Sequence, residues 1–191
     1  MNEESIFHGR GDRRYTAGVN YPNATHELMT EGYLRAAQRL VKTISDNAWG
    51  VDYMVYPVIF LYRHWFELRL KNIIDLGRQL VQVRESGYDT THSLGRLWPV
   101  ARDLIQKVWE GDRPSEFDLI ESIISDFEKF DPYSQAFRYP ITRNGENQLE
   151  GLNEINVMYF SDQMDKIAEF IDGAAMGISV YLDNRSFYGG D

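Results

Sequence analysis

The sequence of 191 residues contains no cysteine. This absence excludes disulfide bonds and thiolate metal ligands, and it suits a reducing compartment. Long apolar runs are also missing, because the most hydrophobic stretch, residues 53–61, is far too short to cross a bilayer. The N-terminal residues lack the apolar core of a secretory signal. We therefore predict a soluble, cytoplasmic protein without membrane association.

Basic residues are scarce relative to acidic ones: 20 Lys and Arg stand against 29 Asp and Glu, for a formal net charge of -9. Clustered basic side chains supply most of a protein's affinity for long nucleic acid, so this balance argues against tight binding to it. One basic cluster does occur near the N-terminus, at Arg10, Arg13 and Arg14. It keeps open a local site for a short RNA or a nucleotide, although a solvated arm is the interpretation that we favour.

No Pro-rich, Ser-rich or low-complexity stretch divides the chain, and 43% of its residues are hydrophobic. This is ample material for one buried core. Residues 1–23 contain glycines and a proline without a sustained period, which predicts an irregular N-terminal arm. We predict a single helical domain over residues 24–183 and a frayed tail over residues 184–191.

Apolar side chains recur at helical spacing in five segments, and no segment alternates as a regular strand would. This pattern predicts an all-α fold, a bundle of about five helices. The first helix ends near Asn47, and its apolar stripe consists of Met29, Tyr33, Ala36, Leu40 and Ile44. The second, from about residue 54 to about residue 84, is apolar nearly all round at its start, so we expect it at the centre of the bundle.

Three further helices follow in the sequence. The third begins after a cap at Thr90 or Thr91, and the fourth begins near residues 114 and 115. The last carries the most regular stripe, which consists of Phe160, Met164, Ile167, Ile171, Ala174, Ile178 and Tyr181. Gly173 and Gly177 reduce its helix propensity, so we expect a close backbone approach or a bend there. The second and last helices are expected to share the core through Trp65, Phe66, Leu70, Ile167, Ile171 and Ile178.

Charged side chains interrupt the second helix at intervals of one turn: Arg63, Glu67, Lys71 and Asp75. The structural interpretation is a ladder of helical ion pairs, each stabilising by about 0.2 to 0.5 kcal/mol when exposed. The functional interpretation is a half-buried cleft, because charges on an apolar helix need partners or a ligand. We favour the ladder and keep both interpretations open.

His64 follows Arg63 directly, and His92 opens the third helix. Neither has a second ligand at the spacing of a helical zinc site, so we predict no metal ion. The sequence has no dinucleotide fingerprint or phosphate-binding loop, and we predict no cofactor. A structural histidine is the interpretation that we favour at both positions, with the ring of His92 against a neighbouring helix or the backbone.

The segment DPYSQAFRYP, residues 131–140, places Arg138 among aromatic side chains. Aromatic faces beside an arginine can stack on a nucleobase and pair with a phosphate, which makes Arg138 and Tyr139 candidate binding residues. The same side chains can instead plug the end of the bundle, with Arg138 paired to Glu67 or to a helix C-terminus. We favour the plug, because a loop between long helices has to cover their ends.

Four segments, in this order, resemble the HEPN superfamily, small helical domains often found in bacterial defence and toxin-antitoxin operons, many of which cut or bind RNA. They are YRHWFELRLK (62–71), HSLGRLW (92–98), SQAFRYP (134–140) and EFIDGAAMGISVYLD (169–183). The first is similar to the first core helix of the family, and the second is similar to the start of the following core helix. The resemblance covers roughly residues 53–183 and implies a HEPN-like bundle that pairs as a homodimer.

The ribonuclease signature of that family is an Arg followed by a His after four to six residues, and this sequence departs from it. The four histidines are His8, His26, His64 and His92, and none stands at that distance after an Arg. The interval from Arg84 to His92 comes nearest, with seven residues between them. The acid-base pair of the family therefore cannot be carried over to this chain.

The resemblance implies a binding or regulatory module in a bacterial defence or toxin-antitoxin setting. Such a module binds RNA, a nucleotide or a partner protein from the same operon without cleavage. One alternative is an enzyme, a divergent ribonuclease that uses Arg63, His64, Glu67 and Arg138. Another is a structural subunit whose surface serves oligomerisation. The candidate binding residues are Arg138, Tyr139, Lys71 and His92.

Overall fold

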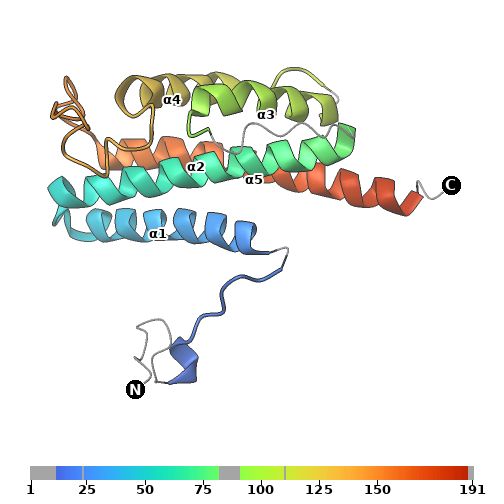
Figure 1. Ribbon diagram of the computed structural model, residues 1–191, viewed down its shortest axis with the longest axis horizontal. Coiled ribbons are helices and arrows are strands. Elements are labelled where there is room, and N and C mark those ends of the chain that lie inside the picture. Colours follow the sequence, from blue (N-terminus) through green and yellow to red (C-terminus); the bar gives the residue numbers. More distant parts are fainter. Residues whose placement is uncertain (1–11, 23, 82–90, 110, 189–191) are drawn as a thin grey trace.

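The computed structural model describes residues 12–22, 24–81, 91–109 and 111–188 (Figure 1). It is 71% helical, and the described part contains five α-helices. These are α1 (Thr25–Asn47), α2 (Val51–Val81), α3 (Leu94–Val108), α4 (Glu116–Phe130) and α5 (Val157–Tyr188). A short 3-10 turn, η2 (Arg13–Tyr15), precedes them, and the described residues form no strand. The prediction of an all-α, single-domain bundle is confirmed.

α2 is the central helix, since its contacts with α1, α3 and α5 are the most extensive in the bundle. α1 lies on one side of the bundle, and α3 and α4 lie on the other (Figure 1). In the described part, α1 makes no contact with α3 or α4. The side chains expected to share the core are all buried: Trp65, Phe66, Leu70, Ile167, Ile171 and Ile178. The apolar stretch of α2 and most of the regular stripe of α5 therefore form the core as predicted, whereas Tyr181 at the end of that stripe is 53% exposed.

α1 buries a different face from the one that the sequence predicts. Its buried residues are Thr30, Leu34, Ala37, Val41 and Ile44, so only Ile44 of the predicted stripe is fully covered. Met29 and Ala36 are exposed, while Tyr33 and Leu40 are half-buried at the edge of the core. α1 packs against both α2 and α5, so its buried face is broad. The centre of this face lies one residue later in the sequence than the predicted stripe.

Helix boundaries differ by a few residues from those expected. α2 begins at Val51, so Pro57 lies in its second turn rather than its first. The cap of α3 is Ser93, whose Oγ accepts a hydrogen bond from the N–H of Arg96 at 3.2 Å. α5 continues to Tyr188, beyond the end expected at residue 183. These shifts leave the order and the number of helices as predicted.

Some sequence predictions concern segments outside the described residues. They involve Arg10 and His8 in the first eleven residues, the end of the second helix near Arg84, and the cap at Thr90. Among the helices of the described ranges, none combines the length and the apolar character that crossing a membrane requires.

Candidate functional site

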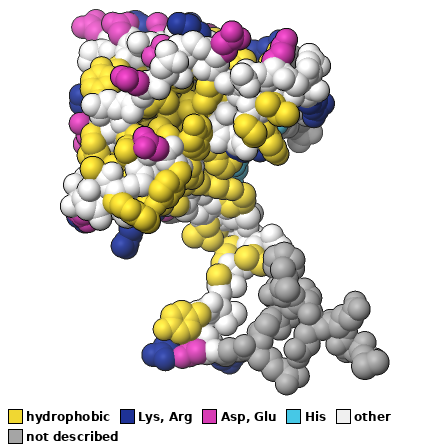
Figure 2. Space-filling view, turned by 90° about the vertical axis from the view of Figure 1, so that its left-hand side faces the viewer, with side chains coloured by type: hydrophobic (Ala, Val, Ile, Leu, Met, Phe, Trp, Pro, Cys, Tyr) yellow, Lys and Arg dark blue, Asp and Glu magenta, His cyan; other side chains and the backbone are white. Residues whose placement is uncertain are grey.

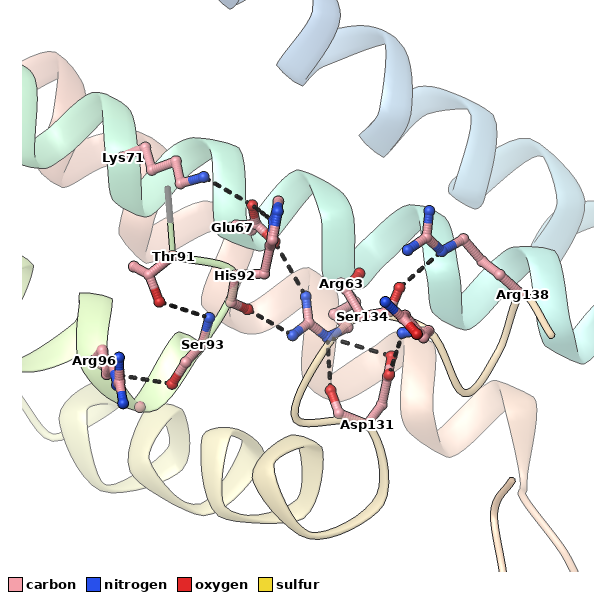
Figure 3. Close-up of polar contacts among 12 residues, drawn as sticks. Arg63, Glu67, Lys71, Thr91, His92, Ser93, Arg96, Asp131, Ser134 and Arg138 are labelled. Atoms are coloured by element: carbon pink, nitrogen blue, oxygen red, sulfur yellow. Dashed lines mark hydrogen bonds and ion pairs between the residues drawn. The ribbon is translucent and has the colours of Figure 1, made fainter. Parts of the chain in front are cut away.

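Arg63 is the centre of a buried polar network between three elements of the bundle (Figure 3). Its side chain projects from α2 and is fully buried. Nη1 lies 3.3 Å from Oε2 of Glu67, and Nη2 donates to the carbonyl oxygen of His92 at 2.8 Å. Nε lies 3.3 Å from the carbonyl oxygen of Asp131 and 3.3 Å from its Oδ2. Arg63 thus ties α2 to the segment that opens α3 and to the residue that follows α4.

Glu67 lies one turn after Arg63, and its carboxylate is also buried. Oε1 accepts a hydrogen bond from Nζ of Lys71 at 2.9 Å and lies 2.9 Å from Nδ1 of His92. Burial alone would raise the pKa of Glu67, but the hydrogen bonds from Lys71 and His92 outweigh burial and hold the pKa below its ordinary value. Glu67 is therefore an ionised carboxylate at neutral pH, surrounded by three partners.

Asp131 fixes the start of the α4–α5 loop, residues 131–156. Its Oδ1 accepts hydrogen bonds from the backbone N–H groups of Gln135 and Ala136, at 2.6 and 2.9 Å. Its Oδ2 faces Arg63, so one carboxylate both shapes the loop and attaches it to α2. Glu128, one turn earlier, accepts hydrogen bonds at the N-terminus of α3.

The network uses its polar groups to join elements of the fold. Burial lowers the pKa of Arg63, while the carboxylates of Asp131 and Glu67 act in the opposite direction. A general acid or base has to reach its substrate, and the buried side chains of Arg63 and Glu67 do not. The network reaches solvent at His92, whose side chain is 62% exposed.

His64 lies apart from this network, although it is next to Arg63 in the sequence. Its ring packs edge-on to Tyr33, with centroids 4.4 Å apart, and stacks on Phe60, with centroids 5.7 Å apart. Burial lowers the pKa of His64, so the ring is neutral at pH 7. The interpretation of His64 as a structural histidine agrees with this aromatic environment.

Arg138 also lies outside the network (Figure 3). Its Nε donates to the carbonyl oxygen of Ser134 at 2.7 Å, and its guanidinium carbon lies 5.3 Å from the ring centroid of Phe60 and 5.4 Å from that of Tyr139. No described contact joins Arg138 to Glu67, so the expected pair does not form. Ser134 has a φ of 57°, and the loop turns there in a way that directs Arg138 to the aromatic surface of α2.

The α4–α5 loop does plug the bundle, through other side chains. Ala136 and Phe137 are buried in the core cluster. Tyr133 and Tyr139, in contrast, are 75% and 54% exposed. The loop therefore covers the helix ends with its buried residues and presents two tyrosine side chains to solvent.

A hollow that we call the arginine pocket lies between this loop and α2. It has a volume of about 450 Å³, and Arg138, Tyr139 and Gln148 of the loop and Tyr56 of α2 contribute to its lining. Its remaining walls are apolar, with Phe137 at the boundary to the core. The pocket combines one cation, two phenol rings and one amide, which is a set of groups suited to an aromatic anion.

A second hollow, the apolar groove, lies beside the arginine pocket and shares Phe137 with it. It has a volume of about 280 Å³ and lies between α4 and α5, with Phe127 and Phe130 on one wall and Tyr159 and Phe160 on the other. Figure 2 shows apolar side chains gathered on this end of the molecule, with acidic side chains beside them. A mixed polar and aromatic pocket and a largely apolar groove are thus adjacent.

A second buried cluster was not predicted from the sequence. Arg69 of α2 is 5% exposed, and it donates two hydrogen bonds to Glu27 of α1, at 2.7 and 3.0 Å. Its Nε lies 2.7 Å from Oδ1 of Asp172 on α5, at an angle that makes an ion pair rather than a hydrogen bond. The cluster connects three helices. The sequence feature that could have indicated this cluster is an arginine, Arg69, within the apolar stretch of α2.

The structure thus brings together four of the sequence-predicted site residues, Arg63, Glu67, Lys71 and His92. It places Arg138 and Tyr139 together in a separate pocket and leaves His64 between aromatic rings. The sequence interpretation did not include Asp131 among the candidate site residues. An aspartate before a proline is a common loop-shaping residue, and that was the signal for it.

Among the described residues, no group of three His, Asp or Glu side chains is placed to hold a metal ion. Comparisons of the chain with protein-family models, with curated proteins and with solved structures find no match. The resemblance to the HEPN superfamily stays a prediction from the sequence.

Proposed function

We propose that this protein is a HEPN-like binding or regulatory module that binds a nucleotide or a short RNA without cleaving it. The setting that the resemblance implies is a bacterial defence or toxin-antitoxin system. The observation that supports this proposal most is the arginine pocket, in which Arg138 lies among aromatic rings at the end of the bundle.

The chemistry of the arginine pocket suits a nucleotide. Because Nε of Arg138 is held by Ser134, the guanidinium is positioned, and no described residue pairs with its two terminal nitrogens. Such a fork binds a phosphate with two parallel hydrogen bonds. Tyr56 and Tyr139 offer faces on which a base can stack. A volume of about 450 Å³ is within the range of small-ligand pockets.

Binding without cleavage is supported by the places of the candidate catalytic residues. Arg63 and Glu67 are buried and engaged with each other, and His64 is stacked on Phe60. The divergent ribonuclease would need these groups and Arg138 to converge on one phosphate. Of these three groups, His64 alone has a described link to Arg138, through their shared contact with Phe60.

Calorimetric titration of the purified protein with the four ribonucleoside monophosphates and with five-nucleotide RNAs tests the proposal. We expect saturable binding that Arg138→Gln weakens by about tenfold or more, since a charged hydrogen-bonding group is lost. Arg143→Gln is the matched control, because it removes the same charge from an exposed position in the same loop. Equal affinities for the two variants would rule out the arginine pocket as the site.

Incubation of the same protein with total RNA, with and without EDTA, tests the second half of the proposal. We expect intact RNA in both samples. If the protein cleaved RNA in the presence of EDTA and His64→Ala abolished that cleavage, the proposal of a binding module would be wrong and the divergent ribonuclease would be the better explanation.

A further inference from the structure

The apolar groove between α4 and α5 is an aromatic site with an acidic rim. Phe127, Phe137 and Phe160 line it, and all three also belong to the core cluster or pack against it. Asp126 and Glu154 lie on its lining, both are exposed, and no described cation pairs with either. The groove therefore suits an apolar side chain that has a positive charge next to it.

The N-terminal arm, residues 12–22, has the complementary chemistry. Tyr15 and Val19 are 85% and 78% exposed, although both are apolar. Arg13, two residues before Tyr15, has no described partner for its side chain. η2 gives the arm local order, because Oδ1 of Asp12 accepts a hydrogen bond from the N–H of Arg14 at 3.0 Å. The arm thus presents a tyrosine beside a basic residue in a preformed turn, away from the bundle (Figure 1).

We infer that the arm docks in the apolar groove of a second copy of this chain, and that two chains exchange arms in a symmetric dimer. Tyr15 enters the aromatic groove, and Arg13 pairs with the rim carboxylates of Asp126 and Glu154. One exchange implies the other, because a two-fold axis repeats each contact. This interaction uses a groove adjacent to the arginine pocket, with Phe137 shared by both linings, and the proposal does not depend on what that pocket binds.

Docking within one chain is disfavoured by the length of the arm. The arm leaves α1, which lies across the α2 and α5 layer from α4. Arg69 pairs with Glu27, at the start of α1, and also with Asp172 of α5. The start of α1 therefore lies near Asp172, which is roughly 18 Å along α5 from Phe160 in the groove. Because the groove lies between α4 and α5, the arm must also pass around the α2 and α5 layer, a helix spacing of roughly 8 to 10 Å. Ten extended residues reach at most about 36 Å, so docking in the chain's own groove requires the arm to be extended over most of its length.

Because the chain has no cysteine, engineered thiols test the exchange on a clean background. One preparation carries Tyr15→Cys and a second, distinguishable by mass, carries Tyr159→Cys on the groove wall. Oxidation of the mixture should give a disulfide-linked pair of unlike chains. The control replaces the second preparation with Met176→Cys, a 70% exposed position further along α5. We expect at least about tenfold less of the linked pair with this control. Equal yields for the two positions would overturn the proposal.

The double variant Tyr15→Cys/Tyr159→Cys separates exchange from docking within one chain. Exchange predicts covalent dimers at micromolar concentration, and a monomer with an internal disulfide at every concentration would overturn it.

Sedimentation equilibrium supplies a test without engineered thiols. We expect the unmodified protein to dimerise, and Tyr15→Ser to raise the dissociation constant by about tenfold or more, as the loss of a central aromatic anchor does. Since Tyr15 is 85% exposed and no described contact joins it to the bundle, circular dichroism of the variant should be unchanged. A monomeric protein at tens of micromolar, or a dimer that Tyr15→Ser leaves intact, would contradict the arm exchange.

Discussion

Nη1 of Arg63 lies 3.3 Å from Oε2 of Glu67, one turn along α2, and neither side chain reaches solvent. A pair at this spacing on an exposed helix face is worth little. Inside a core the same pair is costly to break, because removal of one partner leaves a buried charge uncompensated. Burial therefore decides how much this pair matters, and the sequence spacing alone does not reveal it.

The first prediction concerns this difference. Glu67→Ala should lower the free energy of unfolding by about 3 to 5 kcal/mol, since Arg63 loses a carboxylate in a buried site. Glu31→Ala is the control, because Glu31 makes a 2.6 Å pair with Arg35 at the same spacing on an exposed face. We expect it to cost less than about 0.5 kcal/mol. Urea unfolding followed by circular dichroism measures both, and similar losses would show that burial is not the cause.

The second prediction concerns Asp131 and the shape of the loop. Asp131→Ala removes the acceptor of two backbone N–H groups and a partner of Arg63, so we expect a loss of about 3 kcal/mol or more. Amide exchange at Gln135 and Ala136 should become at least about tenfold faster. Glu150→Ala, at an exposed position of the same loop, should change neither quantity. Unchanged exchange in Asp131→Ala would mean that other contacts hold the loop.

Much of the fold and part of the site could be predicted from the sequence. Five apolar stripes predict five helices, because periodicity reports which side of each helix avoids water. The spacing of Arg63, Glu67 and Lys71 likewise predicts their contacts, since residues four apart on a helix are neighbours. These are local relationships, and local chemistry is what a single sequence records directly.

The long-range partners could not be predicted in the same way. Asp131 is 68 residues from Arg63 in the sequence, and only the packing of the α4 end against α2 brings them together. The plug interpretation pairs Arg138 with Glu67 or with a helix C-terminus, but after the backbone turn at Ser134 its guanidinium lies at Phe60 instead. A left-handed backbone at a serine is set by the hydrogen bonds around it, and no residue type in the segment announces it.

The third prediction concerns acid stability. Burial lowers the pKa of His64 in the folded protein below its ordinary value of 6.5. At pH values between the folded and the unfolded pKa, the folded protein therefore binds fewer protons than the unfolded chain. The contribution of His64 to stability is therefore complete above about pH 6.5 and declines as the pH falls through the folded pKa. His64→Phe keeps a ring between Tyr33 and Phe60 and removes this titration. Its unfolding free energy should fall less between about pH 7 and about pH 5 than that of the unmodified protein.

Glu67 provides an internal reference for that experiment. Its pKa is held below 4.5 in the folded protein, so its stabilisation is present above about pH 4.5 and is lost as the pH falls through the folded value. This more acidic loss should occur both in the unmodified protein and in His64→Phe. If the unfolding free energies of the two proteins changed in parallel over the whole pH range, the loss of stability between about pH 7 and about pH 5 would come from another group. His26 is one such group, because burial also lowers its pKa.

The last prediction uses two glycines inside helices that the sequence alone does not distinguish. At Gly77 of α2, an added Cβ would lie 2.7 Å from Cδ1 of the buried Leu104, so Gly77→Ala should cost about 1 to 3 kcal/mol through overpacking. At Gly173 of α5, where we expected a close approach or a bend, nothing lies within 4 Å of such an atom. The expectation of a close approach is wrong there.

Gly173→Ala should therefore stabilise the protein by about 0.5 to 1 kcal/mol, because alanine restores helix propensity without a clash. Thermal unfolding of the two variants should show shifts of opposite sign, at roughly 2 to 4 °C for each kcal/mol in a chain of this size. If Gly77→Ala also raised the melting temperature, Leu104 would have to repack at no cost, and the tight contact between α2 and α3 at this point would not be a constraint on the fold.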